Sequence, residues 1–290
     1  MRLYRCYAKV NLTLEVLGRR EDGYHELASL AHTISLADDL RVAEADHIVC
    51  RAEGLLVEAE TNLVLQAAEL LREWTRVSAG ADLTLDKRIP VAAGLGGGSS
   101  DAAATLVALN TLWGTHLRAA ELVSLAARLG SDVPFFVSGG AAVLSGRGEQ
   151  LTPVQPVVGQ WLTLAVLPHS LANKTATLYA ALAPGDFTDG QTTFDAAGRI
   201  AEGVPLGELR LYNVFGRIAR RAFPGLEAGW REAELACGRP FHLSGAGPAL
   251  FALATSRAEA HGLVPKLGQL GLNAFAARTV GHARASVATD

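Results

Sequence analysis

Apolar and polar residues alternate in part along residues 2–17, and the run is rich in β-forming side chains. This pattern predicts a pair of strands or one bent strand, in which Lys9 and Asn11 share a face. A polar turn at 18–23 follows. Tyr24 and His25 stand together where the chain leaves that turn, and either can pack as an ordinary half-buried ring or serve a binding site.

Strand and helix patterns succeed one another through the rest of the first half. The expected apolar segment and strands are residues 30–36, 40–50 and 83–87, and the expected helices are 62–74, 102–112 and 118–129. Thr61 or Asn62 is the expected N-cap of the first helix, and Asp101 that of the second. Strand, glycine-rich loop and helix therefore follow one another after residue 83, which is the order that a nucleotide loop requires.

The second half predicts a mixed pattern after a proline- and glycine-containing linker at 152–160. Its expected strands are 161–167, 249–254 and 273–280, and its expected helices are 174–182, 212–223, 226–237 and 259–270. Residues 183–206, rich in Gly, Pro, Thr and Asp, predict a long loop. We therefore expect an α+β protein with two domains, residues 1–152 and 161–290.

Composition narrows the functional class. The chain has 290 residues, 49% of them apolar, and a net charge of −3 without a basic block, which argues against a nucleic-acid surface. No apolar run reaches the roughly 18 residues that cross a membrane, and the first residues lack the apolar core of a signal peptide. Three scattered cysteines predict reduced thiols rather than a metal site. We expect a cytoplasmic protein without nucleic-acid or membrane partners, a monomer or homodimer, whose substrate is a small molecule.

The most informative stretch is the glycine-rich loop at residues 90–106. Its glycines, Gly94, Gly96, Gly97 and Gly98, surround Leu95 and should allow positive φ, so that backbone N–H groups converge on an anion. Ser99 and Ser100 add hydroxyl donors before a helix whose N-terminal dipole favours phosphate. The loop fits neither a Walker motif nor a dinucleotide fingerprint. The alternative to a phosphate cradle is a glycine-rich turn that opens an ordinary helix.

Other candidate residues are less specific on their own. Asp132 follows Gly130 and Ser131, and this segment either caps a turn before Pro134 or delivers an acid to the mouth of the loop. Residues 241–248 form a second turn rich in glycine and hydroxyl groups. Thr175 and Tyr179 share a helix face at a spacing of four. Only four of the 26 basic residues are lysines, either by compositional drift or because each has a specific role. They are Lys9, Lys87, Lys174 and Lys266.

Together these segments resemble the GHMP small-molecule kinases, and among them the family of 4-diphosphocytidyl-2-C-methyl-D-erythritol kinases of the non-mevalonate isoprenoid pathway. The resemblance covers the first half almost continuously. It rests on the stretches Ala8-Lys-Val-Asn-Leu-Thr-Leu, Gly23-Tyr-His-Glu-Leu, Leu36-Ala-Asp-Asp-Leu, Thr61-Asn-Leu-Val, Ala93-Gly-Leu-Gly-Gly-Gly-Ser-Ser-Asp-Ala-Ala, Gly130-Ser-Asp-Val-Pro-Phe-Phe and Ser244-Gly-Ala-Gly-Pro.

The resemblance implies a two-domain α+β GHMP kinase fold with the active site in the cleft between the domains. It implies that Asp132 is the base and Lys9 its neighbour, and that they act on the 2-hydroxyl of the cytidyl substrate. ATP would be the co-substrate, and Mg²⁺ would arrive with it. The implied nucleotide contacts are the loop residues Gly94, Leu95, Gly96, Gly97, Gly98, Ser99 and Ser100, with Asn62, Lys87 and Asn110 on the adenosine side.

On the acceptor side, the resemblance implies that Tyr24 and Tyr179 stack on the cytosine, that His25 reads its edge, and that Asn11 and Thr175 hold the substrate. The chain departs from the family pattern at Lys174, where a serine is usual, and at Val214, where an acid usually follows the asparagine. The alternatives are another GHMP kinase, acting on homoserine, mevalonate or a sugar alcohol, and a nucleotide-binding regulator without turnover.

Overall fold

The computed structural model describes residues 1–53, 62–168 and 173–281. Its strands are β1 (Arg2–Asn11), β2 (Thr13–Arg19), β3 (His25–Ala45), β4 (Ile48–Glu53), β5 (Gly80–Asp86), β6 (Ala141–Ser145), β7 (Gln150–Val154), β8 (Trp161–Val166), β9 (Tyr212–Asn213), β10 (His242–Leu243), β11 (Ala249–Ala254) and β12 (Asn273–Arg278). Its α-helices are α1 (Leu63–Thr75), α2 (Gly97–Leu112), α3 (Ala119–Leu129), α4 (Val133–Ser138), α5 (Lys174–Ala180), α6 (Gln191–Ala201), α7 (Phe215–Ala222), α8 (Leu226–Cys237) and α9 (Arg257–Gln269).

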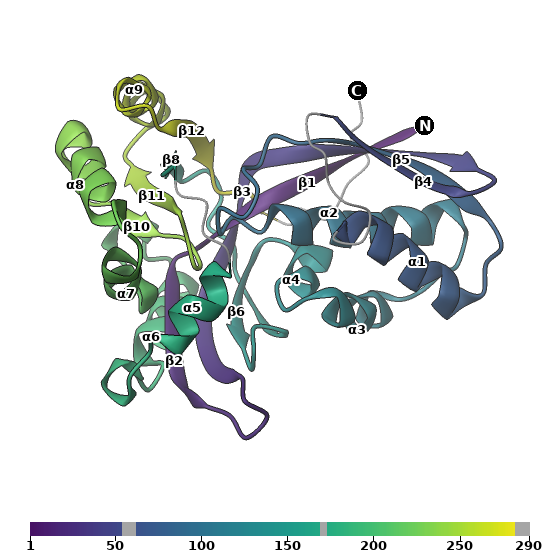
Figure 1. Cartoon of the computed structure of the whole chain (residues 1–290), viewed down its shortest axis with the longest axis horizontal. Coiled ribbons are helices and arrows are strands. Elements are labelled where there is room, and N and C mark those ends of the chain that lie inside the picture. The colour runs from purple at the N-terminus through teal and green to yellow at the C-terminus, as the bar shows by residue number, and fades with distance from the viewer. Residues whose placement is uncertain (54–61, 169–172, 282–290) are drawn as a thin grey trace.

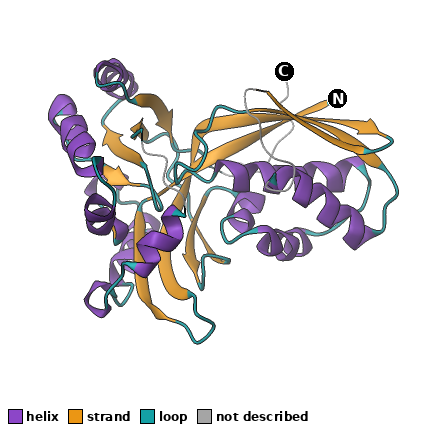
Figure 2. Cartoon of the chain, viewed as in Figure 1, coloured by secondary structure: helices purple, strands orange, loops and turns teal. Residues whose placement is uncertain are grey.

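The first half is organised around the long strand β3, which pairs with β1, β2, β5 and β6. Helices α1 to α4 cover one face of the sheet made by β1, β3, β4 and β5 (Figures 1 and 2). The core between them is rich in alanine along α2, where Ala102, Ala103 and Ala104 are all buried. These small side chains let the helix that follows the glycine loop pack closely against its neighbours.

The second half contains a smaller antiparallel sheet in the order β10-β11-β8-β12. Helices α7, α8 and α9 lie beside it (Figure 1), and a second apolar core fills the space around Phe215, Trp230 and Leu250. The strands predicted at 161–167 and 249–254 and the helix predicted at 226–237 are confirmed, because their apolar spacing matches the face that each buries.

The two halves share a third apolar core rather than meeting only through a linker. It joins Val10 and Leu30 of the first half to Leu164 and Phe251 of the second. Strand β2 also crosses over, since Thr13 and Leu14 pair in parallel with Tyr212 and Asn213 of β9. The boundary drawn at residues 152–160 stays a prediction, although Thr152 to Val154 continue strand β7.

Three sequence expectations were wrong in detail. Residues 25–45 form one continuous strand rather than separate segments at 30–36 and 40–50. Helix α2 begins at Gly97, so Asp101 lies inside the helix and does not cap it. The expected helix at 212–223 begins with the short strand β9, and α7 starts only at Phe215. Asn62 is confirmed as the cap of α1, since its Oδ1 accepts a hydrogen bond from Val64 N, whereas Thr61 lies outside the described residues.

The largest error concerns residues 183–206, which contain helix α6 rather than a continuous loop. The helix buries Thr193, Ala196 and Ile200 on one face. Its N-terminal turn is held from a distance, because Glu15 Oε2 on β2 accepts a 2.7 Å hydrogen bond from Thr193 N. A carboxylate near a helix N-terminus is favourable, and no local pattern could have shown that this one would be there.

Candidate active site

Lys9 and Asp132, which are 123 positions apart in the chain, form an ion pair. Lys9 lies near the end of β1, and Asp132 immediately precedes α4. Lys9 Nζ is 3.3 Å from Asp132 Oδ2, and the lysine side chain is 4% exposed while the aspartate side chain is 39% exposed. The carboxylate is therefore the accessible member of the pair, and its side chain makes no capping bond to the helix behind it.

The Lys9 ammonium is fixed by a chain of buried hydrogen bonds. Lys9 Nζ donates to Asn11 Oδ1 at 2.6 Å, and Asn11 Nδ2 donates to Ser29 Oγ at 2.7 Å. Ser29 Oγ donates in turn to the carbonyl of Thr13 at 2.6 Å. Asn11, which the family resemblance assigned to the substrate, thus also orients Lys9, because each member of the chain limits the rotamers of the next.

The glycine-rich loop turns at only two of its four glycines. Gly94 and Gly96 have φ values of 85° and 73°. Gly97 and Gly98 are the first residues of α2, so they do not adopt the positive φ that we expected the loop glycines to allow. Ala92 carries the other left-handed φ of this segment, at 54°.

The loop is packed too closely to admit a side chain at either turning glycine. A Cβ on Gly94 would lie 2.2 Å from the carbonyl oxygen of Ser244, and a Cβ on Gly96 would lie 2.6 Å from Phe136 Cζ and 3.2 Å from Lys9 Cγ. Ser244 Oγ donates to Gly94 O at 2.9 Å. The two glycine-hydroxyl turns that stood out in the sequence therefore lie against each other, with the Lys9 stem beside them.

The N-terminus of α2 provides hydrogen-bond donors for an anion. The first intrahelical bond runs from Ser100 N to Gly96 O, so the N–H groups of Gly97, Gly98 and Ser99 have no acceptor within the helix. No acidic residue stands in the first turn. Within the described part of the chain, the Ser99 and Ser100 hydroxyls also have no partner. Free donors at the positive end of a helix fit phosphate oxygens.

Lys87 lies close to this turn and belongs to a buried ion cluster. Lys87 Nζ is 2.5 Å from Asp38 Oδ2 and 2.6 Å from Asp101 Oδ2. Burial, together with the charge of Asp38, raises the pKa of Asp101 to about 7 against the opposing effect of Lys87. Asp38 Oδ1 also accepts from the backbone N–H of Arg88 and Ile89, which anchors the segment that leads into the loop.

The three residues expected on the adenosine side all hold protein groups in the structure. Lys87 belongs to the ion cluster, and Asn62 caps α1. Asn110 Oδ1 accepts from Leu117 N at 2.9 Å and from Thr115 Oγ1 at 2.6 Å, which fixes the connection to α3. Their contacts with a nucleotide stay a prediction.

Aromatic side chains gather at the other end of the site. The rings of His25 and Tyr179 stack with centroids 4.9 Å apart and an interplanar angle of 26°. The guanidinium of Arg147 lies 4.7 Å from the centroid of Tyr24, whose side chain is exposed. Desolvation and the charge of Arg19 lower the pKa of His25, which is therefore neutral at pH 7 and offers one donor and one acceptor.

These groups line one cavity of about 1100 Å³ between the two halves of the chain. Lys9, Asn11, Tyr24, His25, Gly94, Ser99, Asp132, Thr175 and Tyr179 all contribute to its wall. Among the described residues, the charged groups of its wall, His25 apart, are the cations Lys9, Arg19, Arg147 and Lys174 and the single carboxylate of Asp132. A chain of net charge −3 thus presents a cationic cavity, which favours anionic ligands. Sequence reasoning missed Arg19 and Arg147, whose only signal was their place in polar turns.

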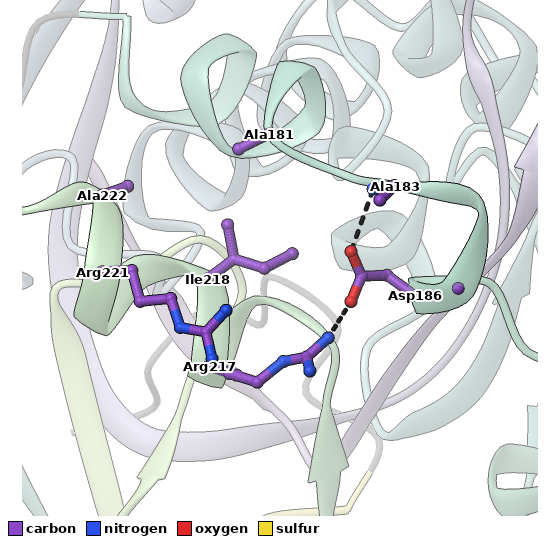
Figure 3. Close-up of a pocket in the computed structure, with 8 residues that line it drawn as sticks. Ala181, Ala183, Asp186, Arg217, Ile218, Arg221 and Ala222 are labelled. Atoms are coloured by element: carbon purple, nitrogen blue, oxygen red, sulfur yellow. Dashed lines mark hydrogen bonds and ion pairs between the residues drawn. The ribbon is translucent and has the colours of Figure 1, made fainter.

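A smaller cavity of about 530 Å³ lies beside α5 and α7 (Figure 3). Asp186 lines it, accepting from Ala183 N at 2.9 Å and pairing with the guanidinium of Arg217. The remaining wall is formed largely by alanines and Ile218, and it contains none of the residues that the sequence singled out. Asn213, nearby in the chain, donates to the carbonyls of Leu243 and Gly245, so it supports the turn beside the glycine loop.

The fold matches that of known kinases. Residues 62–140 match the GHMP kinases N terminal domain. A solved homoserine kinase from Cytophaga hutchinsonii shares the fold, with a TM-score of 0.68 at 15% identity over 98% of this chain and 96% of that one. A solved 4-(cytidine 5'-diphospho)-2C-methyl-D-erythritol kinase superposes with a TM-score of 0.81 at 35% identity, over 96% of this chain and 99% of that one.

Curated relatives agree along nearly the whole chain. The 4-diphosphocytidyl-2-C-methyl-D-erythritol kinase of Dehalococcoides mccartyi strain CBDB1 is 40% identical over 94% of this chain and 96% of its own length. The proteins of the same name from Gloeobacter violaceus and Symbiobacterium thermophilum are 39% and 41% identical over 95% of this chain, and over 93% and 98% of their own lengths. The chain therefore belongs to the GHMP kinases, and within them to the 4-diphosphocytidyl-2-C-methyl-D-erythritol kinase family.

Among the described residues, none of the helices has the length and apolar character that a membrane span requires.

Proposed function

We propose that the protein is the kinase that phosphorylates the 2-hydroxyl of 4-diphosphocytidyl-2-C-methyl-D-erythritol with ATP, giving the 2-phosphate and ADP in the methylerythritol phosphate pathway, and that it acts in the cytoplasm. The supporting observation is that one cationic cavity brings together the Lys9–Asp132 pair, the open N-terminus of α2, and aromatic rings from both halves of the chain. The name carried by the relatives supplies the acceptor.

In the proposed reaction Asp132 accepts the proton of the 2-hydroxyl. The oxygen attacks the γ-phosphorus of ATP while the bond from that phosphorus to the β-phosphate oxygen breaks, and ADP leaves with the electron pair. Lys9, held by Asn11, faces the charge that develops on the attacking oxygen and the phosphoryl group. Asp132 is suited to accepting the proton because its carboxylate is open to the cavity and free of capping bonds.

The nucleotide phosphates would be held by the N–H groups of Gly97, Gly98 and Ser99 and by the two serine hydroxyls. Mg²⁺ bound to those phosphates would neutralise charge on them. Within the described residues, no group of three or more His, Cys, Asp or Glu side chains could hold a metal ion.

The acceptor's cytosine would be recognised by stacking and by its hydrogen-bonding edge. Tyr24 and Tyr179 supply ring faces, and the base would replace the contacts that Arg147 and His25 now make with them. Stacking on one aromatic ring contributes roughly 1–3 kcal/mol. Neutral His25 offers a donor and an acceptor to the edge of the base, and Thr175 lines the cavity next to Tyr179.

The experiment that tests this function is ADP release by the purified protein with ATP and Mg²⁺. The cytidyl acceptor is offered beside homoserine, mevalonate and galactose, one at a time, and acceptor-free protein gives the background rate. Turnover on the cytidyl compound alone is expected. Turnover on another alcohol would keep the kinase and remove the roles given to the aromatic residues. Background rates with all four would leave a nucleotide-binding protein without this activity.

A further inference from the structure

Lys174 joins the two halves of the chain across the cavity. It is the first residue of α5, and its Nζ donates to the carbonyl of Ala92 at 2.5 Å and to the carbonyl of Gly247. Ala92 precedes the glycine-rich loop, and Gly247 belongs to the turn packed against that loop. The ammonium therefore lies where α5 meets the phosphate-binding elements, and the residue lines the cavity.

This ammonium has a hydrogen-bond donor left over and no counter-ion. An ammonium group carries three N–H donors, and two of them go to carbonyl oxygens. Among the residues that the structure describes, no carboxylate forms an ion pair with Lys174, whereas Lys9 has Asp132 and Lys87 has Asp38 and Asp101. Burial and the neighbouring charge of Lys9 lower the pKa of Lys174 to about 8. A half-buried cation without an anion is costly unless a ligand supplies one.

We propose, on the basis of the function proposed above, that Lys174 binds the diphosphate of the cytidyl acceptor. Lys174 and Tyr179 both line the cavity and lie five residues apart on α5, which corresponds to about 7.5 Å along the helix axis. A cytosine stacked on Tyr179 would direct its phosphates along α5 toward this ammonium. The acceptor's alcohol would then continue toward Lys9 and Asp132.

The diphosphate would be received by charges already in place. Its oxygens accept the third N–H of Lys174 and neutralise the repulsion between Lys174 and Lys9. Arg19 and Arg147, the other cations of the cavity, stand near the aromatic end, where Arg147 covers Tyr24. Lys174 thereby becomes a specificity residue that distinguishes a cytidine diphosphate from an uncharged cytidine.

The test compares the affinities of CDP, cytidine and ADP for wild type and Lys174→Met by isothermal titration calorimetry. The methionine keeps an apolar stem that reaches Cε and removes the charged ammonium. CDP binding should weaken at least about tenfold, as expected for a lost charge-assisted hydrogen bond. Cytidine and ADP should stay within about twofold of wild type. Lys266→Met, a change at an exposed lysine on α9 that does not line the cavity, should leave all three affinities unchanged.

A pH series gives a second readout. Wild-type affinity for CDP should fall above about pH 8, as Lys174 loses its proton, and the fall should be absent in Lys174→Met. Lys9 on β1, His25 on β3, Asp132 before α4 and Tyr179 on α5 face the same cavity, and both proteins contain them. The difference between the two profiles therefore isolates Lys174.

Each contrary result has a distinct meaning. Equal losses for cytidine and CDP would show that Lys174 only positions α5 and would overturn the proposal. A loss for ADP but not for CDP would assign its phosphate to the nucleotide instead and would also overturn it. Unchanged CDP affinity in the variant would refute it while leaving the kinase intact. Failure of the wild type to bind either cytidine or CDP would instead contradict the proposed function.

Discussion

Alanine at Gly96 and alanine at Gly98 should change stability in opposite directions, although the two glycines are almost adjacent in one motif. Gly96 has φ at 73°, and an added Cβ would lie 2.6 Å from Phe136 Cζ. The left-handed backbone costs an alanine about 1–2 kcal/mol, and the overpacking costs about 1–3 kcal/mol more. We therefore expect Gly96→Ala to lower the free energy of unfolding by about 2–5 kcal/mol.

Gly98 has helical backbone, and its added Cβ would meet only Leu63 Cδ1, at 3.6 Å. Replacing a helical glycine by alanine removes backbone freedom from the unfolded chain, so Gly98→Ala should raise the free energy of unfolding by up to about 1 kcal/mol. Urea unfolding of both variants and the wild type, followed by circular dichroism, measures the two changes. Because the transition midpoint multiplied by a common slope gives each free energy, the slopes must first be shown to agree.

Gly96→Ala should also lower the activity of the protein. The Cβ of Gly96→Ala would also press on Lys9 Cγ at 3.2 Å, so turnover measured on the folded fraction should fall with stability. Equal stability changes at the two positions, or a stable Gly96→Ala with normal turnover, would show that Gly96 is not packed closely against Phe136 and Lys9.

Two further predictions concern the charged groups. Asp132→Asn should lower turnover by roughly 10²-fold or more while the affinities for ADP and CDP, measured by titration, stay within a few-fold, and near-normal turnover would exclude Asp132 as the base. Lys87→Met leaves the buried carboxylates of Asp38 and Asp101 without their cation, so urea unfolding should report a loss of about 3–5 kcal/mol, against almost none for Lys266→Met. A loss of ADP affinity at unchanged stability would instead favour the adenosine contact expected for Lys87.

The elements that the sequence predicted correctly are those whose packing follows from local spacing. The helix at 226–237 and the strand at 249–254 have their predicted bounds, because one apolar face meets one core. Helix α6 was missed because its first turn contains two threonines and its stabilising partner, Glu15, lies 178 residues away. Its buried positions, Thr193, Ala196 and Ile200, do follow helical spacing, a signal that the polar composition of the segment obscured.

Asp101 shows why a residue type can be recognised and its role still missed. An aspartate after a glycine-rich loop is a reasonable cap, but the left-handed Gly96 starts the helix earlier and turns Asp101 inward. There it pairs with Lys87, which directly follows β5, and Lys87 also pairs with Asp38 on β3. That contact depends on the register between β3 and β5, which pairs Asp39 with Asp86. The register between strands so far apart in the chain cannot be predicted from any short stretch of sequence.

The features of the candidate site also differ in how far the sequence alone could predict them. The glycine-rich loop was visible from its residues alone, whereas Lys9 and Asp132 were joined only through the family resemblance, since 123 positions separate them. The cationic cavity was not visible at all. Its positive charges come from four separate places, namely β1, the end of β2, the turn after β6 and the start of α5, in a chain whose total charge is negative.

Because the four cations come from different elements, both halves of the chain contribute charge to the cavity. Lys9 and Arg147 belong to the first half, Lys174 to the second, and Arg19 to a strand that pairs with the second half through β9. The charge of Lys9 repels that of Lys174, and an anionic ligand bound between them offsets this repulsion. A ligand with two or more phosphate charges should therefore stabilise the folded protein more than its neutral nucleoside does.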